Sequence, residues 1–146
     1  MTALVLDASV VVKWVIPSTK EPLVTESVEL LKRYTDGEVN LFVPDVFWAD
    51  IGNVLWKGVG LRRWPRALAE EATSKMRERD FTTVSSLELL PEALNIAFVH
   101  DRSVYDCLYV ALAIQFKTAM ITADEGLANA LAARLPVKWL GAFAIE

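Results

Sequence analysis

The feature of this 146-residue sequence that most restricts its fold is the alternation of short apolar runs with longer segments of helical periodicity. The runs are rich in Val, Ile and Leu, which favours buried strands. The segments between them repeat apolar residues three and four positions apart, which indicates helices. Alternating strands and helices are typical of a parallel sheet. We therefore expect an α/β fold with a central parallel β-sheet flanked by α-helices on both faces.

The expected elements follow one another with short connections. Strands are predicted over residues 3–7, 40–44, 82–89, 118–122 and 137–140. Helices are predicted from Ser9 and over 23–37, 45–58, 64–80, 91–100, 103–116 and 123–135. The segment 103–116 is apolar nearly all round, so we expect this helix to be buried.

Composition narrows the class of protein. A chain of 146 residues suits one domain. Its hydrophobic fraction of 53% indicates either a well-filled core or an apolar patch that a partner covers. The single cysteine, Cys107, excludes an intrachain disulfide and favours a reducing compartment. No run approaches the length of about 18 apolar residues that spans a membrane, and the N-terminus lacks a signal-peptide pattern, so we expect a cytoplasmic protein.

Two acids follow predicted strands. Asp7 ends the first strand, and Asp124 comes two residues after strand 118–122. If both strands are central, both carboxylates face the crevice at the carboxyl edge of the sheet. The alternative for Asp7 is a helix cap. For Asp124 the alternative is a place in the first turn of a helix opened by a capping box of Thr122 and Glu125.

Two more acids lie on predicted helices. Asp50 sits at the edge of the apolar stripe of helix 45–58, and Asp106 lies within the apolar segment 103–116. Burying an ionised carboxylate without a partner costs several kcal/mol. Arg102, one turn before Asp106, offers a salt bridge as the purely structural explanation.

Together these acids predict a cation site. Four carboxylates in one crevice would raise each other's pKa values, and a divalent ion is the simplest compensation. Oxygen ligands point to Mg²⁺ or Mn²⁺. Zinc is disfavoured because one His and one Cys supply no usual zinc ligand set.

Four stretches resemble a known family, the PIN-domain ribonucleases, and specifically the VapC-type toxins of toxin–antitoxin pairs. They are "LVLDAS", "NVLWKG", "SVYDCLYVALA" and "ITADEGLANA", and they occur in the family's order along essentially the whole chain. The resemblance implies one PIN-like nuclease domain over residues 1–146. It also implies RNA cleavage with Mg²⁺ or Mn²⁺ held by acids, a homodimer, and a cognate antitoxin that blocks the site.

The resemblance also implies roles for individual residues. Asp7, Asp106 and Asp124 match the first, third and fourth acids of the family. Asp50 stands where the family usually has Glu; being one methylene shorter, it would reach a metal only through water. In the implied chemistry, water activated by the metal attacks a phosphodiester and leaves a 3′-hydroxyl and a 5′-phosphate.

Hydroxyl and basic residues are further candidates. Ser9 and Thr122 resemble the small hydroxyl residues that flank the family's site, although local turn or cap bonding would also explain them. The segment 57–66, "KGVGLRRWPR", predicts a loop that binds phosphates and stacks on a base, or else a solvated helix connection. The candidate RNA contacts are Arg62, Arg63, Trp64, Arg66, Lys13 and Arg102.

The expected function is thus a metal-dependent endoribonuclease toxin inhibited by a cognate antitoxin. One alternative is a non-catalytic PIN-like module whose acids only hold an ion or pair with a partner's arginines. Another is a phosphatase of the haloacid-dehalogenase type. That class needs a second Asp two residues after the first, where this chain has Ser9.

Overall fold

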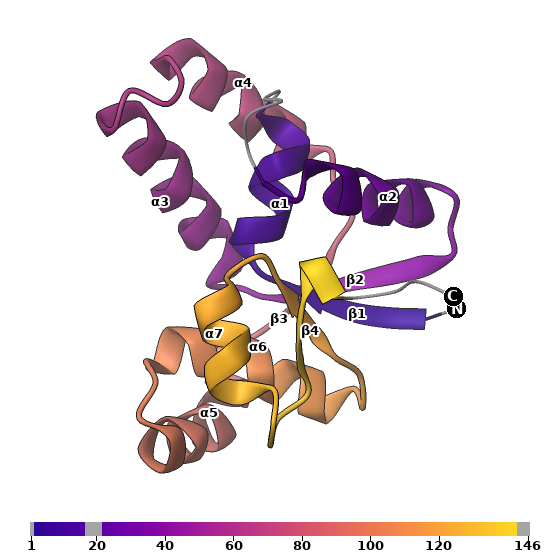
Figure 1. The fold of residues 1–146 in the computed structure, drawn as a ribbon, viewed down its shortest axis with the longest axis vertical. Coiled ribbons are helices and arrows are strands. Elements are labelled where there is room, and N and C mark those ends of the chain that lie inside the picture. The colour runs from indigo at the N-terminus through magenta and orange to yellow at the C-terminus, as the bar shows by residue number, and fades with distance from the viewer. Residues whose placement is uncertain (1, 17–21, 143–146) are drawn as a thin grey trace.

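The computed structural model describes residues 2–16 and 22–142, and these ranges form a parallel sheet covered by helices on both faces (Figure 1). The strands are β1 (Thr2–Leu6), β2 (Val39–Pro44), β3 (Thr82–Val84), β4 (Met120–Thr122) and β5 (Val137–Trp139). Their order in the sheet is β3-β2-β1-β4-β5, and each neighbouring pair is parallel. The predicted α/β fold class is therefore confirmed.

The helices divide between the two faces of the sheet. Figure 1 shows α1 (Ala8–Val15), α2 (Val24–Thr35), α3 (Phe47–Gly60) and α4 (Arg66–Arg77) on one side, with α3 and α4 extending away from the sheet as an arm. On the other side lie α5 (Ser86–His100), α6 (Val104–Gln115) and α7 (Glu125–Leu131). A 3₁₀ turn, η1 (Leu140–Ala142), follows β5. No helix within the described ranges is long and apolar enough to cross a membrane.

The centre of the sheet is buried on both faces. Val5 and Leu6 of β1 and Ile121 of β4 have no exposed surface. A strand covered from both sides must be apolar at every position, which explains why these strands read as continuous apolar runs. Helix α6 contacts β1, β2 and β4 on one side and α5 on the other. All residues from Cys107 to Ala113 are buried, as the apolar character of this segment predicts.

The predicted boundary between strand 82–89 and helix 91–100 is wrong. The strand expected over 82–89 ends at Val84, and α5 begins at Ser86, before Pro91. The cause is a helix cap: the Ser85 side chain accepts a hydrogen bond from the backbone N–H of Leu87. Because the cap starts the helix at Ser86, the following leucines are helical and Pro91 lies inside the helix instead of at its start.

Trp64 is a second correction. Its ring is buried, and its Nε1 donates to the backbone carbonyl of Leu55 at 3.1 Å. A Cβ built on Gly58 would lie only 1.9 Å from the ring, so the glycine makes room for the indole. The prediction that Trp64 stacks on an RNA base is wrong, because the ring instead packs the connection between α3 and α4 against helix α3.

This packing predicts the effect of a single methyl group. Gly58→Ala should lower the free energy of unfolding by about 1–3 kcal/mol, because the indole must move out of its contact. Gly52→Ala on the same helix is the matched control: outside its chain neighbours and its own helix backbone, no described atom lies within 4 Å of the added Cβ, so it should stabilise the helix by about 1 kcal/mol. Urea unfolding of both variants measures the difference, and equal stabilities would contradict the packing described here.

Candidate active site

The order in which the chain adds strands to the sheet reverses between β1 and β4. The chain passes from β1 outward to β2 and β3, and only later returns to add β4 and β5 on the other side of β1. In open parallel sheets, ligands bind outside the carboxyl ends of the strands at such a reversal. Asp7 directly follows β1, and Thr122 is the last residue of β4. Both therefore lie at this position.

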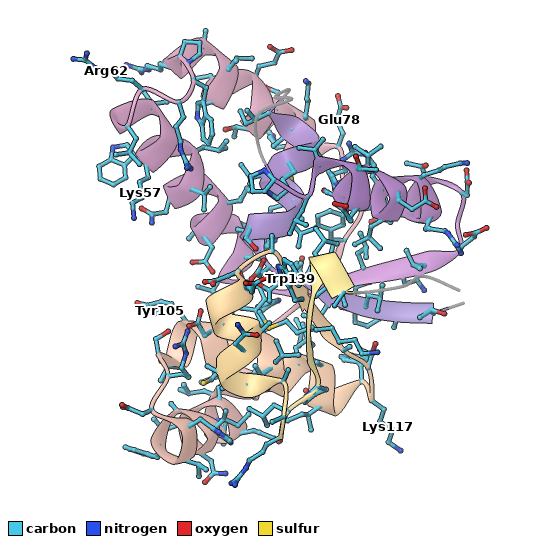
Figure 2. The ribbon with its side chains drawn as sticks, in the orientation of Figure 1. Lys57, Arg62, Glu78, Tyr105, Lys117 and Trp139 are labelled. Atoms are coloured by element: carbon cyan, nitrogen blue, oxygen red, sulfur yellow. The ribbon has the colours of Figure 1, made fainter. Side chains whose placement is uncertain are left out.

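A cavity of about 210 Å³ brings acids from separate elements together. Asp7 at the start of α1, Asp50 on α3 and Asp106 on α6 all line it. Asn53, Tyr105 and Tyr109 are among the other lining residues. Figure 2 shows the Tyr105 side chain projecting outward between the α3 arm and the helices of the opposite face. We call this space the acidic cavity.

Asp7 is held by hydroxyl groups from two elements. Its Oδ2 accepts from Thr122 Oγ1 at 2.6 Å, and its Oδ1 accepts from the backbone N–H and the hydroxyl of Ser9. Ser9 Oγ in turn accepts from the N–H of Ala123 at 2.9 Å, and Thr122 Oγ1 accepts from the N–H of Asp124 at 3.0 Å. Thr122 thus combines contact with the acid and the local backbone bonding considered from the sequence, whereas the hydroxyl of Ser9 bonds the acid and a backbone N–H 114 residues away.

The same contacts make Asp7 the N-cap of α1, so the cap and site interpretations of this residue are compatible. Its carboxyl group is nevertheless costly to ionise. Burial raises the pKa of Asp7 from 3.8 to about 6, although the hydrogen bonds from Ser9 and Thr122 act in the opposite direction. A positive charge next to this group would remove much of the penalty.

Asp106 lies at the side of the cavity and is half exposed. Its Oδ2 is 3.6 Å from Arg102 Nη2, so the ion pair considered from the sequence is present. Burial raises the pKa of Asp106, the Arg102 charge lowers it, and the negative charges of Asp124 and Asp50 raise it further. The field of Asp124 and of Asp50 therefore reaches Asp106.

Asp124 occupies a different position from the other acids. It is exposed and does not line the acidic cavity. Its Oδ1 accepts from the N–H of Leu127 at 3.1 Å, so Asp124 itself is the N-cap of α7. The prediction that Thr122 opens a capping box is wrong, because Asp124 is the N-cap and the hydroxyl of Thr122 donates to Asp7. Asp124 stands at the rim, close enough to act on Asp106 through its charge.

Asp50 has a partner that the sequence interpretation did not consider. Tyr109 Oη donates a hydrogen bond of 2.6 Å to Asp50 Oδ2. The phenol is buried, and burial together with the negative charge of Asp50 raises its pKa far above the ordinary value. Tyr109 therefore stays protonated and remains a donor. A signal was available in the sequence: Tyr109 follows Asp106 by three residues, which places both on one face of a helix.

The acids fit a hard divalent ion by their chemistry. Their donors are carboxylate oxygens from three elements, which suit Mg²⁺ or Mn²⁺. In the described ranges no three His, Cys, Asp or Glu side chains are already arranged as direct ligands of one ion. Mg²⁺ usually keeps several of its waters and takes only one or two carboxylates directly, so a full protein cage is not required.

The basic candidates are spread over the molecule. Figure 2 shows Arg62 at the outer end of the α3–α4 arm, far from Tyr105 at the acidic cavity. Arg63 follows it in the exposed turn, and Arg66 Nε pairs with Glu70 Oε1 at 2.6 Å on the exposed face of α4. Lys13 is half-buried on α1. Arg102 pairs with Asp106 and so lies directly beside the acids.

The chain matches the family model described as "PIN domain" over residues 4–131. It is 30% identical to Ribonuclease VapC3 of Pyrobaculum aerophilum over 86% of this chain and 92% of that relative. Its fold resembles the crystal structure of PAE2754 from P. aerophilum, with a TM-score of 0.68 and 20% identity over 96% of this chain and 85% of that one. It also resembles VapBC2 of Rickettsia felis bound to a promoter DNA fragment, with a TM-score of 0.63 and 10% identity over 94% of this chain and 98% of that one.

Because Asp7 is buried, removing its charge should raise the free energy of unfolding by an amount that depends on pH. Between pH 3.8 and about 6 the folded chain keeps a proton on Asp7 that the unfolded chain has lost, so the free energy of unfolding falls as pH rises through this window. Above it, ionised Asp7 costs at most about 3 kcal/mol. Asp7→Asn keeps the capping oxygen and removes the charge. In metal-free buffer it should therefore be more stable than the parent chain at pH 7, and less so at pH 4.5.

Urea unfolding in EDTA at the two pH values measures this gain. Asp36→Asn, at an exposed acid following α2, is the control and should show no comparable gain. A parent chain that equals or exceeds Asp7→Asn in stability at pH 7 would contradict the cost assigned to the buried charge.

Proposed function

The chain belongs to the PIN-domain family, and on that basis we propose that it is a VapC-type endoribonuclease toxin that hydrolyses RNA at the acidic cavity. One observation carries the proposal: carboxylates from α1, α3 and α6 line one cavity at the reversal point of the sheet. The 30% identity to a ribonuclease VapC over most of the chain supports the same activity.

The proposed cofactor is Mg²⁺ or Mn²⁺, held by Asp7, Asp106 and Asp50, with Asp124 at the rim. When bound, such an ion lowers the pKa of a coordinated water and offsets negative charge on the phosphate. Ser9 and Thr122 hold the Asp7 carboxylate in place through their hydroxyls. Asp106 stands beside Arg102, whose guanidinium can bind a phosphate oxygen once a cation takes its place at the carboxylate.

The proposed reaction is hydrolysis of a phosphodiester. Water attacks phosphorus and its proton passes to a carboxylate of the cluster. The bond from phosphorus to the 3′ oxygen breaks, and that oxygen takes a proton from solvent, which leaves a 3′-hydroxyl and a 5′-phosphate. Lys13 and Arg102 are the proposed phosphate contacts near the scissile bond. Arg62, Arg63 and Arg66 belong to the arm and would contact RNA farther along the strand.

Carboxylate removal tests the activity directly. Asp7→Asn and Asp106→Asn should each lower RNA cleavage about 100-fold or more, because each removes charge that holds the ion. Glu78→Gln, at the exposed end of α4, is the control and should keep full activity. EDTA should stop cleavage by the parent chain, and added Mn²⁺ should restore it. Undiminished cleavage by Asp7→Asn would contradict the site.

The same assay separates the enzyme from a non-catalytic module. A module whose acids only bind an ion or a partner predicts no cleavage of total RNA by the purified chain with Mn²⁺. End mapping of any products then tests the expected 3′-hydroxyl and 5′-phosphate ends.

The proposed partners are an antitoxin and a second copy of the chain. Solved structures that share this fold include a toxin–antitoxin complex of Klebsiella pneumoniae, with a TM-score of 0.60 and 12% identity over 97% of this chain and 99% of that one. We extend an antitoxin partner to this chain as part of the proposal, together with a cytoplasmic location.

Helix α5 offers a surface for the second copy. Leu89, Ala93 and Ile96 are buried on its inner face. On another face Leu87, Leu90, Leu94 and Phe98 are 78%, 40%, 42% and 80% exposed, which leaves a stripe of large apolar side chains in water. We call this stripe the outer face of α5.

The spacing of the outer face suits a two-fold dimer. In an antiparallel pair of α5 helices with Leu87 opposite the partner's Phe98, Leu94 would lie one position away from the partner's Leu90. The spacing of the exposed apolar residues is therefore nearly the same in both directions along α5, and a closed two-fold interface requires such a pattern. The antiparallel order also aligns the helix dipoles favourably.

Two charges on the outer face test this dimer. The double variant Leu94→Glu/Phe98→Glu should weaken self-association by about 100-fold or more, because each copy then buries two unpaired charges. Both side chains are exposed in the single chain, so the fold should persist. Analytical ultracentrifugation measures the effect, with Val28→Glu on α2, 49% exposed, as control. A parent chain that is monomeric at tens of micromolar, or a double variant that still dimerises, would contradict the proposed interface.

A further inference from the structure

We propose that Tyr109 is a positioning residue for the metal site, holding Asp50 in one orientation so that a single carboxylate oxygen faces the ion or its hydration shell. This inference rests on the proposed function. The geometry that carries it is the 2.6 Å hydrogen bond from Tyr109 Oη to Asp50 Oδ2 at the wall of the acidic cavity.

The first step is the placement of the two groups. Tyr109 is only 3% exposed, and it lies one helical turn after Asp106 on α6. Helix α6 therefore delivers a carboxylate and a phenol to the same cavity. Asp50 comes from α3, on the other side of that cavity. The hydrogen bond thus joins the α3 arm to the buried helix at the place where the acids meet.

The second step concerns the length of the acid. An Asp side chain has one torsion fewer than Glu and a shorter reach. Once the phenol binds Oδ2, the carboxylate can no longer rotate freely about its last bond. Oδ1 then becomes the oxygen available to an ion, directly or through a water. The phenol compensates for a short acid by fixing its direction.

A purely structural alternative exists, because a buried phenol needs a hydrogen-bond partner whatever its function. On that view Asp50 merely satisfies Tyr109, and removing the hydroxyl changes stability alone. The two explanations differ in what Tyr109→Phe does to ion binding, and in whether that effect depends on Asp50.

The test is a double-variant cycle read by Mn²⁺ affinity without RNA. Tyr109→Phe should weaken Mn²⁺ binding by about 10-fold, the lower end of the range for groups that orient metal ligands. In an Asp50→Ala background the same change should have almost no effect, because no carboxylate remains to be oriented. Calorimetry or Mn²⁺ electron paramagnetic resonance measures the four affinities. RNA cleavage should fall with Tyr109→Phe in kcat rather than in KM.

The control is Tyr34→Phe, which removes a phenol that accepts from the backbone N–H of Asp80 at 3.2 Å, away from the acidic cavity. It should leave Mn²⁺ affinity unchanged. Equal losses from Tyr109→Phe with and without Asp50, or no loss in either, would overturn the positioning role while wild-type cleavage still upheld the proposed function. A parent chain that neither binds Mn²⁺ nor cleaves RNA would overturn both.

Discussion

The interaction on which the site depends is the anchoring of one carboxylate between two strands that are adjacent in space and distant in sequence. Asp7 leaves the end of β1 and is held by Thr122 at the end of β4 and by Ser9 on α1. These bonds fix the group without neutralising it, because hydroxyls carry no charge. The structure therefore keeps a carboxylate whose pKa burial raises to about 6. A buried carboxylate of this kind gains more from a neighbouring cation than an exposed carboxylate does. The cation offsets the free energy that burial of the negative charge costs.

Asp50 and Asp106, which come from other elements, add negative charge to the same cavity. Asp106 pairs with Arg102, whose charge lowers the pKa of Asp106, while the negative charges of Asp50 and Asp124 raise it. Three carboxylates, those of Asp7, Asp50 and Asp106, line the described cavity. The salt bridge considered from the sequence is present. Under the proposed function it is one of two states of Asp106, and binding of an ion is the other.

The sequence predicted those features that depend on local pattern. Strands and helices followed from periodicity, and the parallel sheet followed from their alternation. Asp7, Asp50 and Asp106 stood out because each interrupts an apolar context. What failed depended on contacts between distant residues or on a competing cap. Trp64 looks exposed in "RRWPR", and only the missing side chain of Gly58 lets it become buried. Ser85 turns a strand-like "SSLEL" into a helix, and Tyr109 reads as one more apolar residue until Asp50 meets it.

The pairing of β1 with β4 has a consequence for synthesis. Thr122, which holds Asp7, lies 115 residues later in the chain. On a ribosome Asp7 is translated well before β4, and Thr122 can bond to it only after β4 has left the exit tunnel. A nascent chain that still lacks β4 therefore cannot anchor Asp7 in this way, and under the proposed function its nuclease centre assembles only once β4 has emerged.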